Sequence, residues 1–221
     1  MNLQEGMLTR HSVRGFKDTP VSKELLIDVL RLGTTAVSAL NSQPWEFVVL
    51  TGELKDKIAN ANVECFMSGA EEDLQDPVLT GRQRQGMVGV GKQLLTAMDI
   101  KREDKEGRIW WSQRGYKFFD APAVILICMD KACDEVYHRI DIGALCQNIA
   151  LAAHSYGLGT CVELQAVSYQ KGVREYLPQH ADKNFIIGIA IGYPDENFPA
   201  NSVVSARDDV EELTTWYGFD E

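Results

Sequence analysis

The sequence of 221 residues is poor in positive charge, with 22 lysines and arginines against 32 aspartates and glutamates. The resulting net charge of -10 opposes long-range attraction to DNA, RNA or an anionic membrane surface, so we expect none of these as partners. A local cluster of arginines can still bind a small anion, because short-range pairing depends on the charges nearby.

Cysteine and histidine are also sparse. The five cysteines have no metal-ligand spacing, and their odd number is typical of reduced thiols. The four histidines lack metal-ligating companions, so we predict no metal site. Residues 1–8 show no secretion signal, which makes the cytoplasm the expected location.

Several catalytic motifs are missing as well. Gly86, Gly89 and Gly91 do not follow a predicted strand, so they form no dinucleotide-binding fingerprint. The chain has no Walker sequence, no G-x-S-x-G elbow and no convincing nucleophile or acid–base pair. We therefore predict no catalytic side chain: in an enzyme, a bound cofactor would have to supply the reactivity.

What is present is a single domain, 1–221, in which strands and helices alternate. No repeat or linker divides the chain, and the alternation indicates an α/β or α+β sandwich with one sheet. Strands are predicted at 45–50, 123–129, 157–163 and 184–192, and helices at 2–10, 23–36, 53–66, 83–100, 137–156 and 167–177.

The apolar stretch 137–156 is the predicted central helix. Its polar residues Asp141, Asn148 and Ser155 form one narrow stripe, so we expect burial on most of its circumference. Its charged residues argue against a membrane span. Its small residues would let another backbone, a second subunit's included, come close.

Two segments lack a core pattern. Residues 67–118 are polar and irregular, which suits either a substrate-specificity region or mobile lid, or a helical hairpin that only covers the sheet. The tail at 198–221 carries Trp216, Tyr217 and Phe219, which need a surface to pack on, either in their own domain or in a neighbour.

Three short stretches could carry chemistry. In an extended chain Arg10, Ser12 and Arg14 point to one side and offer donors to a phosphate; the alternative is a helix C-terminus whose arginines face the last carbonyls. Asn41 and Gln43 carry amides suited to the edge of a flat heterocycle, and Pro44 favours an extended Gln43. The alternative for these two is a polar loop entering a strand.

The third stretch is 157–164, which is rich in glycine and small residues. Such residues allow a flat ligand close to the backbone. The alternative is a tight junction between a helix and a strand.

In their order and spacing, these pieces resemble the FMN-dependent nitroreductase family. The resemblance covers nearly the whole chain except about 67–115. The stretches that carry it are RHSVRGF, NSQPWEFVVL, APAVILICMD, DIGALCQNIALAAHSYGLGTC and IIGIAIGYPDENFPANSVVSAR.

The resemblance implies an α+β fold, a three-layer sandwich with a central mixed β-sheet flanked by helices. It implies an intertwined homodimer with two FMN sites at the subunit interface. The helix at 137–156 would lie in that interface, and the tail at about 198–221 would wrap the partner subunit.

The resemblance also implies residue roles. Arg10, Ser12, Arg14 and Arg207 match positions at the FMN phosphate and ribityl chain, and His11 contributes main chain. Asn41 and Gln43 match the amides at the flavin ring, and Ser38 lies in the loop that approaches from the other subunit. The family stretch whose backbone lies near the reactive nitrogen of the flavin ring is matched by Cys161, Glu163 and Leu164. Two positions depart from many relatives, which have a glycine at Leu164 and a lysine at Ser205.

Residues 67–118 form the predicted acceptor pocket, with Trp110, Trp111, Arg114 and Phe118, together with Tyr116, placed to hold a planar molecule. The implied activity is a ping-pong reduction by two electrons, in which NADH or NADPH is the donor and a nitroaromatic, quinone or similar compound the acceptor. The alternatives are a non-catalytic module that binds or senses flavin, and a reductive dehalogenase or enone reductase on the same fold.

Overall fold

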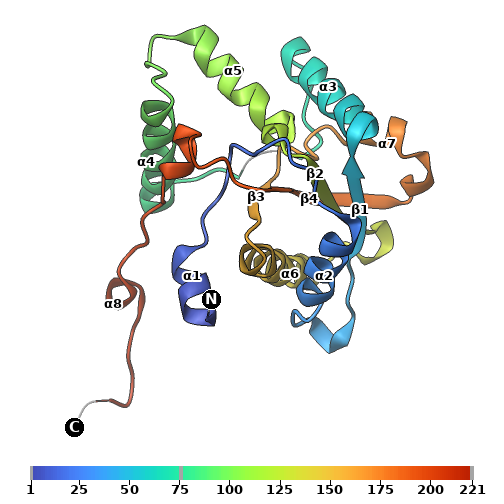
Figure 1. The fold of residues 1–221 in the computed structure, drawn as a ribbon. Coiled ribbons are helices and arrows are strands. Elements are labelled where there is room, and N and C mark those ends of the chain that lie inside the picture. The colour runs from blue at the N-terminus through green and yellow to red at the C-terminus, as the bar shows by residue number, and fades with distance from the viewer. Residues whose placement is uncertain (1, 75–76, 220–221) are drawn as a thin grey trace.

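The computed structural model describes residues 2–74 and 77–219. Residues 75–76 of the predicted acceptor segment, and 1 and 220–221 of the predicted domain and tail, lie outside the described residues. The chain folds into three layers, with one sheet between two layers of helices (Figure 1). The predicted sandwich is confirmed.

The sheet has four strands in the order β1-β2-β4-β3. They are β1 (Glu46–Thr51), β2 (Ala123–Asp130), β4 (Lys183–Gly192) and β3 (Gly159–Glu163), and every neighbouring pair is antiparallel. The sheet becomes mixed at its β3 edge, where Ser12 forms an isolated parallel bridge with Thr160. The apolar run in β2 predicts a central strand, and β2 indeed lies between two others with its apolar residues buried.

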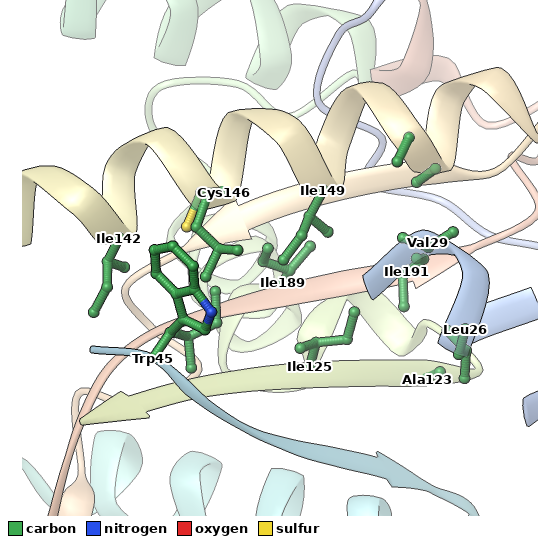
Figure 2. Close-up of a cluster of buried hydrophobic side chains, with 14 of the residues drawn as sticks. Leu26, Val29, Trp45, Ala123, Ile125, Ile142, Cys146, Ile149, Ile189 and Ile191 are labelled. Atoms are coloured by element: carbon green, nitrogen blue, oxygen red, sulfur yellow. The ribbon is translucent and has the colours of Figure 1, made fainter. Parts of the chain in front are cut away.

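One face of the sheet is covered by α2 (Lys23–Gly33) and α6 (Val136–Ser155). Alternate residues of β2 and β4 point toward these helices: Figure 2 shows Ile125, Ile189 and Ile191 below Ile149 of α6. The start of α2 is fixed by Ser22, whose hydroxyl accepts a hydrogen bond from the backbone N–H of Leu25.

The other face packs against α3 (Gly52–Ser68) and α7 (Gln170–Tyr176). Phe118 and Phe119, from the short helix η2 (Phe118–Asp120), complete this second core. The two clusters use opposite sides of β2, as the period of two along a strand requires.

The segment 67–118 is mostly helical. It contains α4 (Gly81–Ala97) and α5 (Lys105–Tyr116), of which α5 packs on α3 while α4 lies beside η5 (Pro199–Ser202) (Figure 1). The helical hairpin was one alternative for this segment, but the bounds of α5 were not predicted, because its aromatic and charged residues show no clear apolar stripe.

The remaining elements are short. At the N-terminus α1 (Leu3–Thr9) begins with a capping box between Asn2 and Glu5, and α8 (Val210–Leu213) lies in the tail. Three further turns are η1 (Ala39–Asn41), η3 (Lys131–Cys133) and η4 (Pro178–His180).

Helix α6 is less buried in the single chain than the sequence predicts. Its outward side leaves Tyr137 and Ile140 exposed at 72% and 62%, so it is not buried on most of its circumference. Of its predicted polar stripe, Asp141 is buried against η1 and Asn148 bonds to Thr35 beside α2.

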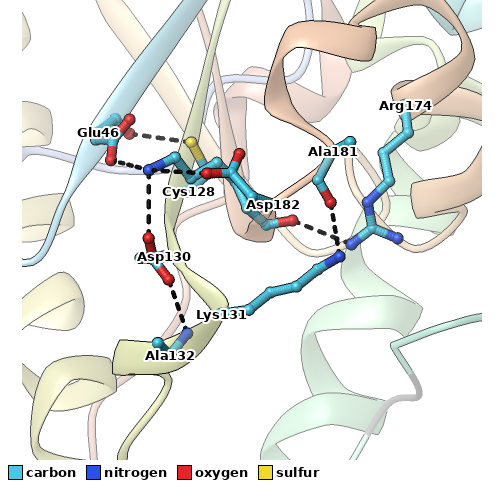
Figure 3. A network of polar contacts seen from close by, with 9 residues as sticks. Glu46, Cys128, Asp130, Lys131, Ala132, Arg174, Ala181 and Asp182 are labelled. Atoms are coloured by element: carbon cyan, nitrogen blue, oxygen red, sulfur yellow. Dashed lines mark hydrogen bonds and ion pairs between the residues drawn. The ribbon is translucent and has the colours of Figure 1, made fainter.

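A polar network lies at the end of the sheet where β1 and β4 begin (Figure 3). The ammonium Nζ of Lys183 lies 2.6 Å from Oε1 of Glu46 and 3.7 Å from Oδ2 of Asp130, and Lys131 donates to the carbonyl of Ala181 at 2.6 Å. Much of this network is exposed, so we assign it to strand registration rather than to ligand binding.

Candidate functional site

The segment after α1 runs along the β3 edge of the sheet. Ser12 bridges Thr160, and the backbone N–H of Val13 donates to the carbonyl of Thr160 at 2.9 Å. Val13 and Gly15 are buried, while Arg10, Ser12 and Arg14 are half-buried on the other side. Of the two alternatives for this segment, the structure shows the extended one, and α1 ends before Arg10.

Arg207 of the tail lies close to Arg10. Burial lowers the pKa of Arg10, and the neighbouring positive charge of Arg207 lowers it further. The charges of Arg10 and Arg14 both act on Cys161, and that of Arg14 acts on Glu163. None of the three arginines makes an ion pair with a carboxylate of the described residues. Three guanidinium groups thus gather around β3 with uncompensated charge.

The groups on β3 do not neutralise this charge. Cys161 is buried, and burial raises the pKa of its thiol to about 12, so the thiol stays protonated. Glu163 is also buried; burial raises the pKa of its carboxyl well above 4.5, although Arg14 opposes the shift. Neither oxygen of this carboxyl has a hydrogen-bond partner among residues 2–74 and 77–219. Leu164 follows, half-buried against the second core.

A hollow of about 410 Å³ lies between this edge and α6. Arg10 and Ser12 line it from the N-terminal segment, Val162 from β3, and Gly143 and Gln147 from α6. Of the three arginines, Arg10 therefore borders an open space with room for a ligand. His11 lies beside this region and bonds through Nδ1 to the carbonyl of Thr9.

The predicted amide loop, from Ser38 to Gln43, precedes β1. Gln43 donates from its side-chain Nε2 to Oδ1 of Asn41 at 3.2 Å, and its backbone N–H donates to Oγ of Ser38 at 3.2 Å. The prediction of an extended Gln43 is wrong: its φ is 45°. The chain turns through η1 and closes back on Ser38, which overrides the preference set by Pro44.

This loop is strained and depends on α6. Leu40 and Asn41 also have positive φ angles of 54° and 57°, a conformation that disfavours side chains other than glycine. The buried carboxylate of Asp141 accepts from the backbone N–H of Ala39 at 3.1 Å and from Oγ of Ser42 at 3.5 Å. Sequence reasoning missed this role, although the polar stripe of the helix contained Asp141.

The arginines and the amides lie at opposite edges of the sheet. The arginines gather at β3, whereas the amide loop leads into β1, with β2 and β4 between them (Figure 1). Three strand spacings, roughly 14 Å, separate these two edge strands. A single chain therefore does not bring the predicted phosphate side and the predicted ring side together.

The predicted acceptor residues have different surroundings. Phe118 is 0% exposed in the second core, so its placement in an acceptor pocket is wrong. Arg114 was predicted to face the acceptor, but its guanidinium bonds to Asp120 and to two backbone carbonyls. Trp110 is 44% exposed and Trp111 is half-buried, so both stay predictions.

The segment 67–118 does contain a hollow of about 870 Å³, between α4 and the start of α5. None of the four predicted acceptor residues lines it. Its walls combine apolar residues, among them Met87 and Leu95, with side chains of both charges, among them Lys92, Arg108 and Glu103. Sequence reasoning missed these residues because helical periodicity alone does not show which helix face remains uncovered.

Within the described part of the chain, no three His, Cys, Asp or Glu side chains gather closely enough to hold a metal ion. No helix of that part combines the length and apolar character needed to cross a membrane.

Comparisons with known proteins agree on one family. The family model described as "Nitroreductase family" matches residues 7–193. The chain is 32% identical over 218 residues to a nitrobenzene nitroreductase of Ectopseudomonas oleovorans, covering 94% of this chain and 93% of that one. It is 29% identical over 219 residues to a 4-nitrobenzoate reductase of Pseudomonas putida, covering 96% and 94%.

Among solved structures, the chain is similar to an FMN- and NADPH-dependent nitroreductase from Sphigopyxis sp. strain HMH. The TM-score is 0.93 at 30% identity, and the match covers 99% of this chain and 100% of that one.

Proposed function

Because this chain belongs to the nitroreductase family, we propose that it is an FMN-dependent NAD(P)H oxidoreductase that reduces nitroaromatic compounds or similar planar acceptors by two electrons. Bound FMN would supply the redox chemistry, the transfer of two electrons from NADH or NADPH to the acceptor. The chain's own residues bind and orient these molecules.

The observation that carries the proposal is the group of unpaired arginines at β3. Arg10, Arg14 and Arg207 come from two distant parts of the sequence, and none has a carboxylate partner among the described residues. A phosphate dianion, held by guanidinium groups and the hydroxyl of Ser12, would compensate this charge. The protonated Cys161 and the raised pKa of Glu163 fit the same arrangement, because a negative charge here would repel phosphate.

The flavin ring requires the amide loop of a second copy. Asn41 and Gln43 lie at the other edge of the sheet, so a homodimer is needed to join the two halves of the site. The exposed apolar residues of α6, with Trp216, Tyr217 and Phe219 in the tail, supply surface for such an association. Five unpaired cysteines support a reducing compartment, which we take to be the cytoplasm.

The acceptor class follows from the relatives, whose names give nitrobenzene and 4-nitrobenzoate as substrates. In this chain Trp110 and Trp111, with ring centroids 6.3 Å apart, present aromatic faces suited to a flat ring. The site needs no acid–base side chain, which agrees with the absence of such a pair from the sequence.

The test is direct. The purified protein should be yellow, contain one FMN per chain and lose its colour with NADH or NADPH in the absence of oxygen. Adding nitrobenzene or 4-nitrobenzoate should then restore the colour and consume the acceptor. A colourless protein that gains no FMN on reconstitution would refute the proposal, and bound FMN without turnover would favour the flavin-sensing alternative.

A further inference from the structure

The backbone at Arg14 and Gly15 is held by the side chain of Asn201. Both backbone N–H groups donate to Oδ1 of Asn201, at 2.7 Å and 3.1 Å. In return Nδ2 of Asn201 donates to the carbonyl of Gly15 at 2.7 Å and to that of Asp195 at 2.9 Å. One amide thus fixes three of the four polar backbone groups of these two residues.

Arg114 of α5 fixes the fourth. Its Nη2 donates to the carbonyl of Arg14 at 3.0 Å and to that of Phe119 at 3.1 Å, while Nη1 pairs with Asp120 at 2.6 Å. The guanidinium also lies 4.7 Å from the ring centroid of Phe198. Phe198 in turn packs so closely on Gly15 that a Cβ there would lie 2.1 Å from its ring.

The same arginine supports strained backbone. Phe118, Phe119 and Asp120 have φ angles of 57°, 51° and 57°, three consecutive residues in the left-handed region. This conformation is strained for residues other than glycine, so the turn persists only if neighbouring groups hold it. Arg114 bonds to two of the three residues.

From this geometry we infer that Asn201 and Arg114 are positioning residues for the cofactor phosphate. We call these two side chains the clamp. Together they fix the main chain of Arg14 and Gly15. The clamp aims the side chain of Arg14 and keeps Ser12 and Arg10 in register along β3. The inference rests on the proposed function, because the anion it serves is the phosphate of FMN.

The physical reason is preorganisation. A guanidinium binds an anion more tightly when its backbone is already fixed, because less conformational freedom is lost on binding. The clamp also joins α5 and the start of the tail to the phosphate segment. Neither clamp residue needs to touch the ligand.

The experiment measures dissociation constants of FMN and of riboflavin, which lacks the phosphate, for wild type and for Asn201→Ala. Flavin fluorescence gives both constants. We expect the FMN constant to rise by about tenfold to a hundredfold, as the loss of one or two net hydrogen bonds predicts, and the riboflavin constant to change by less than about threefold. General damage to the fold would weaken both ligands equally.

A second variant, Arg114→Lys, tests the clamp if Asn201→Ala folds poorly. Lysine keeps the charge and stem but cannot reach three acceptors with one rigid fork, so the same selective loss of FMN is expected. The matched controls are Asn184→Ala and Arg174→Lys, which remove comparable half-buried groups away from the clamp and should leave both constants unchanged.

The outcomes separate the two claims. If wild type binds no FMN, the proposed function is refuted. If wild type binds FMN and the clamp variants bind it equally well, or lose FMN and riboflavin by the same factor, the positioning role is refuted. Thermal unfolding of the FMN-free variants shows which losses come from misfolding.

Discussion

The two edges of the sheet differ in how completely one chain builds them. At the β3 edge, the backbone of Arg14 and Gly15 is fully hydrogen-bonded by Asn201 and Arg114, and Arg10 borders a hollow. At the β1 edge, Leu40 is fully exposed, and the loop around it depends on one buried carboxylate, that of Asp141.

This difference separates two tasks. The β3 edge is preorganised for charge, because unpaired guanidinium groups are held in place before any ligand arrives. The β1 edge offers the exposed amides of Asn41 and Gln43. They stand on a strained loop, at the opposite edge of the sheet from the arginines of the same chain. Left-handed residues that persist on a surface often mark a binding segment, and here they mark the part that a second copy would use. In the proposed homodimer, the β3 edge of one chain would hold the phosphate, and the amide loop of its partner would reach the ring.

The largest expected effect comes from removing charge at the β3 edge. In Arg10→Ala/Arg207→Ala, the loss of two charged hydrogen-bond donors should raise the FMN dissociation constant by at least about a hundredfold. Riboflavin should be affected by less than about threefold, because it has no phosphate. Fluorescence titration with both flavins measures the contrast.

The control for this variant is Lys23→Ala/Arg31→Ala, which removes two positive charges from the exposed surface of α2. It should leave both constants unchanged. If it weakens FMN as much as the site variant does, net charge rather than local geometry governs binding, and the contrast between the two edges disappears.

A smaller effect is expected at the β1 edge. Asp141→Ala removes the acceptor for Ala39 and Ser42, so the amide loop loses its fixed conformation. We expect FMN and riboflavin to weaken together, each by about tenfold, because the ring common to both is affected. Asp28→Ala, on the exposed side of α2, is the matched control. A loss confined to FMN would show that this loop serves the phosphate instead.

Much of the fold could be predicted from the sequence. The apolar run in β2, the cap at Ser22 and the long helix α6 are local signals, whereas the sequence left Arg10 to Arg14 open between an extended segment and a helix C-terminus. The clamp could not be predicted, because Asn201 and Gly15 meet only through tertiary packing. Arg114 and Phe118 were misplaced for the same reason: residue type suggests a pocket, but burial and hydrogen-bond partners decide.

The smallest predicted effect concerns Glu163, the one carboxyl buried among the arginines without a hydrogen-bond partner in the described chain. Because burial raises its pKa, the folded protein binds this proton more tightly than the unfolded chain does. The contribution of Glu163 to the free energy of unfolding is therefore full below about pH 4.5. It declines as the pH rises toward the pKa of the folded state.

Glu163→Gln removes that titration. In the FMN-free protein, the variant should therefore gain stability relative to wild type as the pH rises, by on the order of 1 kcal/mol at pH 8, and show no such gain at pH 4. Urea unfolding across this range measures the difference, with Glu53→Gln on the exposed surface of α3 as the control. A difference that does not change with pH would mean that Glu163 titrates normally, and that the β3 edge carries a negative charge among its arginines before the cofactor binds.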